Sequence, residues 1–420
     1  MAYDDPRYRG ASDDVDPGDY PYAPTGPGER TDGISRQGYA RADLDDLFED
    51  PAHGEPGRDR FGVHLVWELV LLVAVSLVGY LLYRDGRFLN TGGGLRGLML
   101  SATVLGLLVL GAGLSLRAAV PNLSVGPIAL ASALYFAEHI DRGVPVAATQ
   151  AVVLALAVGA AIALVSVALH VPAWAASFGA ALAVVLWIQQ HHQVLTLPKS
   201  TYQPLPHAAY WFGGFAALAV VGAVLGSVRS VRRTVGRLRP VSDPADRRGG
   251  GAAVVGIAAL LGSSVLAAGA GMLTVLQTGR ATPTDTSLAL TGLALGGALL
   301  AGTSVYGRRG GLLGTVLATA LLAMVVRYFQ VAELRVSPLA VGAVAIGVGL
   351  VASRLVEAFG RPRPLFAEDD RWRTVAPTTA TAPLPPHDQD RTDSRSTGWT
   401  SPLPASSADD RWGDDEWRGR

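Results

Sequence analysis

Ten long runs of apolar residues decide what this chain can fold into. Each is close to the roughly 20 residues that an α-helix needs to cross a bilayer, and runs of this length indicate membrane spans. They predict an all-α fold: a polytopic integral membrane protein with about ten transmembrane helices. The ten runs cover approximately residues 62–83, 96–116, 120–138, 145–169, 173–191, 208–227, 252–276, 287–305, 311–328 and 337–355.

The two ends of the chain differ from this apolar centre. Residues 1–60 are rich in Asp, Gly, Pro and Arg and show no hydrophobic periodicity, and residues 358–420 are rich in Pro, Thr, Ser and Asp. Segments with so little apolar surface do not offset the entropy lost on ordering. We therefore predict disordered cytoplasmic tails over 1–60 and 358–420, on either side of a transmembrane permease domain over 61–357.

The placement of arginine sets the expected orientation, because cytoplasmic loops of membrane proteins carry an excess of Lys and Arg. The segment between the sixth and seventh runs, residues 228–251, is rich in arginine and is expected in the cytoplasm. With ten spans, both termini then lie inside as well. Arg84, Arg87 and Arg96 fall outside and count against this scheme. The abundance of Arg over Lys suggests a bacterial source, so we expect a bacterial cell membrane protein.

The third run is interrupted at its start. Pro121 has no N–H to donate, Asn122 and Ser124 carry side chains that compete for backbone hydrogen bonds, and Gly126 follows. Irregular backbone at membrane depth persists only where protein buries it or where it lines a wet cavity. Two interpretations stay open: a cytoplasmic turn with the helix starting at Leu130, or a broken helix inside the bundle near a substrate path.

The composition excludes several kinds of catalytic site. The chain has no cysteine, which excludes disulfides and thiol chemistry. Lys199 is its only lysine and follows Pro198, whereas a P-loop needs Gly-Lys-Ser/Thr. The neighbouring His191 and His192 point in different directions on a helix and have no carboxylate nearby. We expect no ATPase activity of its own, no metal, no cofactor and no nucleic-acid partner.

Ionisable residues are scarce inside the runs. Glu68 lies near the start of the first run, where its side chain is expected to reach the interface, and Glu138, His139 and His170 lie at ends of runs. An ion-coupled transporter normally places carboxylates or histidines deep in the bundle. Their absence from mid-span favours a pathway powered from elsewhere, or no transport at all.

Three motifs in order resemble those of ribose-type (simple-sugar) ABC importer permeases, the inner-membrane component of binding-protein-dependent transport systems. Residues 122–126, NLSVG, resemble the D-L-S-V-G signature, with Asn122 in place of the usual Asp. Residues 170–179, HVPAWAASFG, resemble a segment in which Val-Pro opens the next span. Residues 300–315, LAGTSVYGRRGGLLGT, are similar to the family's G-G-T-S sequence and glycine-rich turn, the most specific of the three.

The sequence also departs from this family in two places. The family has a short coupling helix before its seventh span, whereas residues 237–251 hold two prolines and a triple glycine, which disfavour a helix. The Asn-Gly pair that the family carries before Val-Pro is replaced here by residues 164–166, LVS. These departures concern ATPase coupling and substrate contacts rather than the membrane fold.

The resemblance implies a permease subunit that passes a small polar solute, most often a simple sugar. The implied partners are ABC ATPase subunits, a second permease subunit, an extracytoplasmic solute-binding protein and the lipid membrane. The alternative is a diverged, non-transporting scaffold of the same fold that recruits partners through its tails. The altered coupling loop and the tails favour the scaffold, and the retained glycine turn favours transport.

The resemblance also assigns residues to three roles. Those implied for the translocation path are Asn122, Ser124, Gly126, Gly302, Thr303 and Ser304. Those implied for ATPase coupling are Arg232, Arg233, Arg237, Arg239, Arg247 and Arg248. The glycines implied for the structural turn are Gly307, Gly310, Gly311 and Gly314.

Overall fold

A computed structural model gives the fold of the protein, and it describes residues 61–88, 93–190, 193–198, 201–227, 249–283, 287–304 and 312–360. The predicted tails lie outside the described residues, apart from 358–360. The six arginines predicted for ATPase coupling also lie outside them, as do the His191–His192 pair and Gly307, Gly310 and Gly311.

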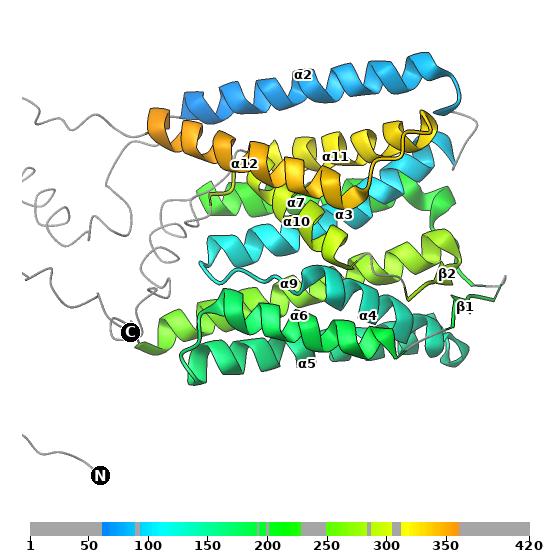
Figure 1. Ribbon diagram of the computed structural model, residues 1–420, viewed down its shortest axis with the longest axis vertical. Helices are drawn as coiled ribbons and strands as arrows, with labels where there is room; N and C mark the ends of the chain where they lie inside the picture. The colour runs from blue at the N-terminus through cyan, green and yellow to red at the C-terminus, as the bar shows by residue number, and fades with distance from the viewer. Residues whose placement is uncertain are drawn as a thin grey trace, which may run out of the picture. The chain divides into compact units, whose positions relative to one another are not determined.

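The described residues form ten α-helices, and each lies within or across one of the ten predicted runs (Figure 1). The predicted all-α polytopic fold is therefore confirmed. The helices are α2 (Phe61–Asp85), α3 (Gly94–Arg117), α4 (Val125–Glu138), α5 (Val144–Ala168), α6 (Ala173–Gln189), α7 (Ala208–Ser227), α9 (Gly249–Thr278), α10 (Ser287–Leu300), α11 (Gly314–Val331) and α12 (Pro338–Gly360).

Short elements connect the helices at one end of the bundle. The strands β1 (Leu195–Thr196) and β2 (Arg280–Ala281) pair antiparallel, and two 3₁₀-helices, η2 (Ile140–Arg142) and η3 (Leu205–His207), precede α5 and α7. We call this the sheet end. The opposite end, where α2 begins and α12 finishes, is the tail end (Figure 1). Ser227, Gly249, Leu300 and Gly314 also lie toward the tail end, because the helices alternate in direction.

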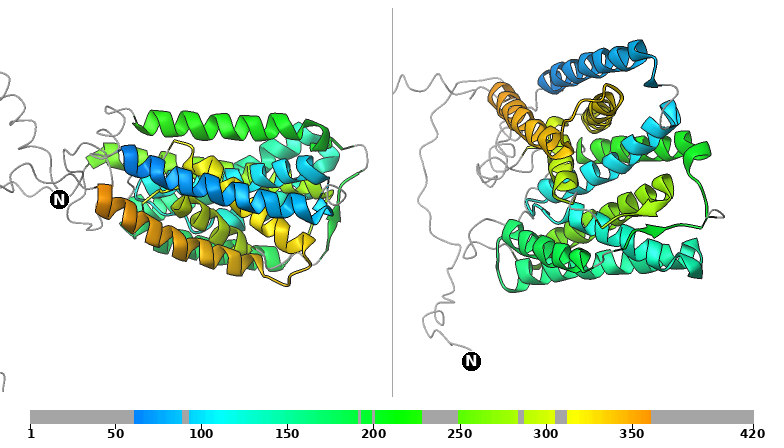
Figure 2. Two further views of the ribbon diagram at one scale, coloured as in Figure 1. Left: turned by 90° about the horizontal axis from the view of Figure 1, so that it is seen from above. Right: turned by 45° about the vertical axis from the view of Figure 1, so that its right-hand side comes forward.

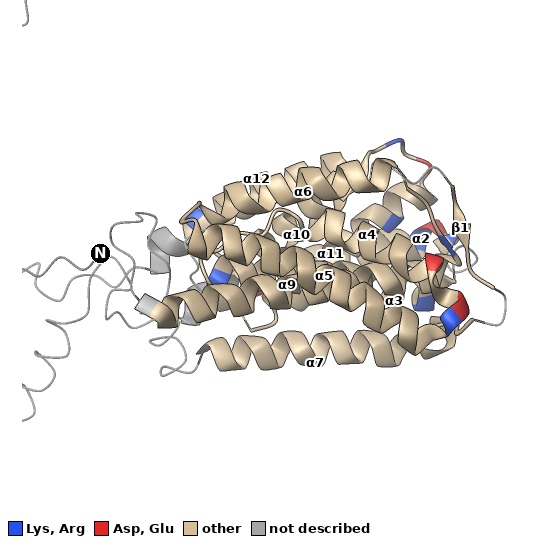
Figure 3. Cartoon of the chain, turned by 90° about the horizontal axis from the view of Figure 1, so that it is seen from below, with Lys and Arg blue, Asp and Glu red and all other residues tan. Residues whose placement is uncertain are grey.

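The surface of the bundle is that of a membrane protein. Seven helices are long and apolar enough to cross a bilayer, and α4, α6 and α10 are shorter apolar helices. Large apolar side chains are exposed along the helices, such as Val66 on α2, Val153 on α5 and Val344 on α12. The described charged residues gather instead near the helix ends (Figure 3). Exposed apolar side chains along the helices and charged residues at their ends are typical of helices in contact with lipid acyl chains. The pattern therefore indicates a multi-pass membrane protein.

Two halves of the bundle follow the same order with opposite direction. In each half a long helix, α3 or α9, is followed by a short helix, α4 or α10, and then by a long one, α5 or α11. Helices α3 and α9 pack against each other, α4 packs on α9, and α10 packs on α3. Both short helices are 14 residues long, about 21 Å, which is less than the roughly 30 Å of a bilayer core.

Candidate functional site

The candidate site is the break between α3 and α4. Residues 118–124 are not helical, and α4 begins at Val125 rather than at Leu130. The side chains of Asn122 and Ser124 have no solvent exposure. The predicted helix start at Leu130 is therefore wrong, and the break is packed inside the bundle as the second interpretation expected. A substrate path near it stays a prediction.

Asn122 connects the break to α3 and α9. Its Nδ2 donates a hydrogen bond of 2.7 Å to Ser263 Oγ on α9, and its backbone N–H donates to Ser115 Oγ on α3 at 3.2 Å. Its Oδ1 accepts from both the N–H and the hydroxyl of Ser124. Ser263 Oγ lies 2.9 Å from the carbonyl of Leu260, to which it donates. The amide of Asn122 therefore supplies the donor that the Ser263 oxygen still needs, which an ionised Asp does not.

Hydroxyls from two further helices satisfy the rest of the break. Ser177 on α6 accepts from the N–H of Leu123 at 3.1 Å and donates to the carbonyl of Pro121 at 3.0 Å. Thr291 on α10 accepts from the N–H of Gly126 at 3.2 Å and donates to the carbonyl of Leu123 at 3.2 Å. Polar backbone groups that lack water must find such partners, because leaving one unpaired costs several kcal/mol in lipid.

The first turns of α4 and α10 meet in the interior. A Cβ atom on Gly126 would overlap the carbonyl oxygen of Ser287 and would lie 2.6 Å from Thr291 Oγ1, so only glycine allows this approach. The N-terminal end of a helix carries a partial positive charge. Two such ends therefore face one another here, among hydroxyl and amide groups.

The second group of predicted path residues lies elsewhere. Gly302 has a φ of 85°, and Thr303 and Ser304 are buried after the end of α10. A Cβ atom on Gly113 of α3 would lie 4.0 Å from Thr303 Oγ1. Ser115, which binds Asn122, is two residues further along α3 and so about 200° around the helix. Helix α3 therefore lies between the two groups, and the structure does not bring them into one site.

Helix α2 holds the turn that follows α10. The indole Nε1 of Trp67 donates a 2.7 Å hydrogen bond to the carbonyl of Leu300, the last residue of α10. The carboxylate of Glu68 accepts from the N–H groups of Leu313 at 2.6 Å and Gly314 at 3.0 Å, where α11 begins. One turn of α2 thus caps the C-terminus of one helix and the N-terminus of the next.

The burial of Glu68 differs from what the sequence led us to expect. We expected its side chain to reach the interface, but it is 8 % exposed and faces the start of α11. Its partners are about 245 residues away in the chain, and no local pattern points to them. A carboxylate within an apolar run was the one available signal, since such residues are rarely placed in spans without a role.

Gly314 brings the start of α11 close to the end of α10. A Cβ atom there would overlap the carbonyl oxygen of Ala301, so the start of α11 contacts the end of α10 directly.

Among the residues that the structure describes, no group of three or more His, Asp or Glu side chains could hold a metal ion. Comparisons with protein families, with curated proteins and with solved structures found no match to this chain.

Proposed function

We propose that this protein is the membrane-spanning permease subunit of an ABC importer. The observation that supports this most directly is the pair of half-helices, α4 and α10, whose first turns meet at Gly126 and Thr291. In secondary transporters, discontinuous helices in corresponding positions of two inverted halves usually form the substrate site near the bilayer midplane, and we extend that reasoning to this bundle. The order of the three sequence motifs supports the same assignment.

The chemistry of the break favours a neutral polar solute such as a simple sugar. The groups around it are the amide of Asn122 and the hydroxyls of Ser124, Ser263 and Thr291. They bind one another in this conformation. When the two halves separate, the same donors and acceptors become available to the hydroxyls of a solute, which replaces hydrogen bonds one for one.

The energy source in this proposal is a separate pair of ATPase subunits. The middle of the described helices carries none of the carboxylates that an ion-coupled mechanism uses. The ATPases bind at the tail end, where α7 and α9 flank residues 228–248 and where α10 meets α11. This end faces the cytoplasm in the proposal, with both termini, and a second permease subunit and an external solute-binding protein complete the transporter.

The test is affinity purification of the full chain from its native membrane in mild detergent, with and without residues 237–248. The proposal expects an ABC ATPase in stoichiometric amount, lost on this deletion, together with uptake of a radiolabelled pentose that depends on the chain. The matched control removes twelve residues of the C-terminal tail, 380–391, and retains the ATPase.

The competing function is a non-transporting scaffold. It is favoured by the complete pairing around Asn122, where the side chain and the backbone N–H groups of Leu123, Ser124 and Gly126 all have partners inside the protein. Recovery of soluble partners that bind residues 1–60 or 361–420, with no ATPase, would establish this alternative and exclude the permease.

A further inference from the structure

A groove of about 540 Å³ lies between α3 and α7 at the sheet end of the bundle. Helix α7 runs along the edge of the bundle and packs mainly on α3 (Figure 2, left; Figure 3). Thr103 and Leu107 of α3 form one wall, and the first half of α7 with the segment before it forms the other. The volume falls within the range of small-molecule sites, about 300–1,000 Å³.

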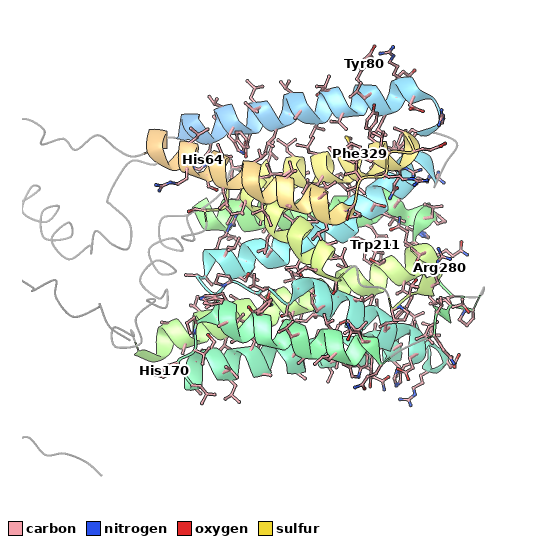
Figure 4. The ribbon with its side chains drawn as sticks, viewed as in Figure 1. His64, Tyr80, His170, Trp211, Arg280 and Phe329 are labelled. Carbon is pink, nitrogen blue, oxygen red and sulfur yellow. The ribbon has the colours of Figure 1, made fainter. Side chains whose placement is uncertain are left out.

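The mouth of the groove is aromatic and carries hydrogen-bonding groups. The rings of Tyr202 and His207 stack with centroids 5.8 Å apart, and Trp211 Nε1 donates to the Tyr202 hydroxyl at 3.3 Å. Because the Tyr202 oxygen accepts this bond, its own hydrogen is available to donate outward. Tyr80 on α2 is exposed toward the same end (Figure 4). Tyr and Trp at one level of a membrane protein are typical of the lipid headgroup region.

The depth of the groove is apolar. Leu218 lies ten residues into α7, about 15 Å from its start, which is half the thickness of a bilayer core. The ring of Phe215 packs over Gly106 of α3 and forms the floor. A Cβ atom on Gly214 would meet no atom within 4 Å, so the space beside it is open.

We propose that this groove binds one phospholipid from the leaflet at the sheet end. Its acyl chain lies along Leu107, Phe215 and Leu218, and a headgroup oxygen accepts a hydrogen bond from Tyr202. Three features favour a lipid over other occupants. The change from polar mouth to apolar depth follows a lipid's own orientation, and the described lining contains no Asp, Glu, Lys or Arg. The groove also opens on the exposed side of α7. There Tyr210 is 82 % exposed and Leu218 49 %.

The experiment uses the full chain in phosphatidylcholine vesicles that contain a phosphatidylcholine with a photoreactive diazirine in mid-chain. After illumination, labelled peptides are mapped by mass spectrometry. We expect labelling concentrated at Leu107 and at 214–218. Gly214→Leu fills the groove and lowers the labelling of Leu107 to the level of the exposed Val153 on α5. Gly213→Leu is the matched control, because Gly213 also has open space around it but does not line the groove.

A second variant tests the polar end without changing the shape of the groove. Tyr202→Phe keeps the ring and removes the hydroxyl, and it should weaken lipid retention through detergent washing about fivefold, the factor that one net hydrogen bond represents. Equal labelling of Leu107 in Gly214→Leu and Gly213→Leu would overturn the proposal. So would a cross-link between two copies through α7, which would show a second copy in the groove. Neither result depends on whether the protein transports a solute.

Discussion

Two non-helical stretches of the described residues are stabilised in opposite ways: residues 118–124, and the two ends of the α10–α11 connection, 301–304 and 312–313. Residues 118–124 find their partners on four helices, α3, α6, α9 and α10, through the neutral side chains of Ser115, Ser177, Ser263 and Thr291. The turn from α10 to α11 is held by two neighbouring residues of the peripheral α2, Trp67 and Glu68. The conformation of the first stretch can change only if the helices that it bonds to move apart. The conformation of the second can change if α2 alone shifts.

The largest expected effect comes from Gly126→Ala, which pushes the two half-helices apart. The added methyl group overlaps backbone at Ser287, which cannot rotate away, and overpacking of this kind costs about 3 kcal/mol. Denaturant unfolding in micelles measures the loss. Gly213→Ala, where the new methyl group meets nothing, should be neutral or slightly stabilising. Equal stability of the two variants would show that the half-helices do not depend on their close contact.

The next effect comes from removing the amide of Asn122. Asn122→Ala leaves the N–H of Ser124 without its acceptor, and one unpaired buried group costs about 1–3 kcal/mol. Ser263 keeps its hydrogen bond to the carbonyl of Leu260, so the loss of the amide adds little there. The same unfolding measurement tests this. Ser76→Ala is the control, because the Ser76 hydroxyl bonds only to its own helix on an exposed face. A loss no larger than that of Ser76→Ala would contradict the central role given to the break.

Loss of the Glu68 carboxylate should act on the turn alone. Glu68→Ala leaves the N–H groups of Leu313 and Gly314 uncapped, at a cost of about 1–2 kcal/mol. Hydrogen exchange should then speed up at 312–315 and stay unchanged at 122–126. Glu68→Gln keeps one acceptor oxygen and should restore part of the protection. Faster exchange at both places would mean that the two stretches form one cooperative unit, and the comparison between them would fail.

Trp67→Phe is expected to have the smallest effect, about 1 kcal/mol, because it removes one hydrogen bond and keeps most of the ring packing. The readout is again hydrogen exchange, here at the last turn of α10. If Trp67→Phe weakened the turn more than Glu68→Ala, the carboxylate would not be its main support.

The helices were predictable because apolar length is a local property of a sequence. The break before α4 was predictable for the same reason, since Pro121, Asn122 and Ser124 disfavour a helix without any knowledge of neighbours, although Gly126 lies inside α4. The partners of the break were not, because Ser263 and Thr291 lie 141 and 165–168 residues away. Nothing in a short window marks one buried serine among many as the acceptor of a particular amide.

The end of α10 was predictable only in part. The run 287–305 has no proline and predicted a full span, yet the helix ends at Leu300. The chain leaves the helical path at Gly302, with a φ of 85°, where Trp67 caps Leu300 and where Gly314 contacts Ala301. The N–H of Gly302 donates to the carbonyl of Leu299 and the N–H of Thr303 to that of Ala298, so Gly302 itself is a local signal for this helix end. The contacts that Trp67 and Gly314 make with it come from distant parts of the chain, and the sequence around 300 could not give those.

The contact between Gly126 and Thr291 also constrains how the protein is made. At about 5–20 residues per second, synthesis of the 165 residues between them takes on the order of ten seconds. During that time α4 has emerged from the ribosome, too short to span the bilayer, with its preceding polar backbone still lacking α9 and α10. We therefore expect α4 to reach its final position in the membrane only after α9 and α10 have been synthesised and inserted.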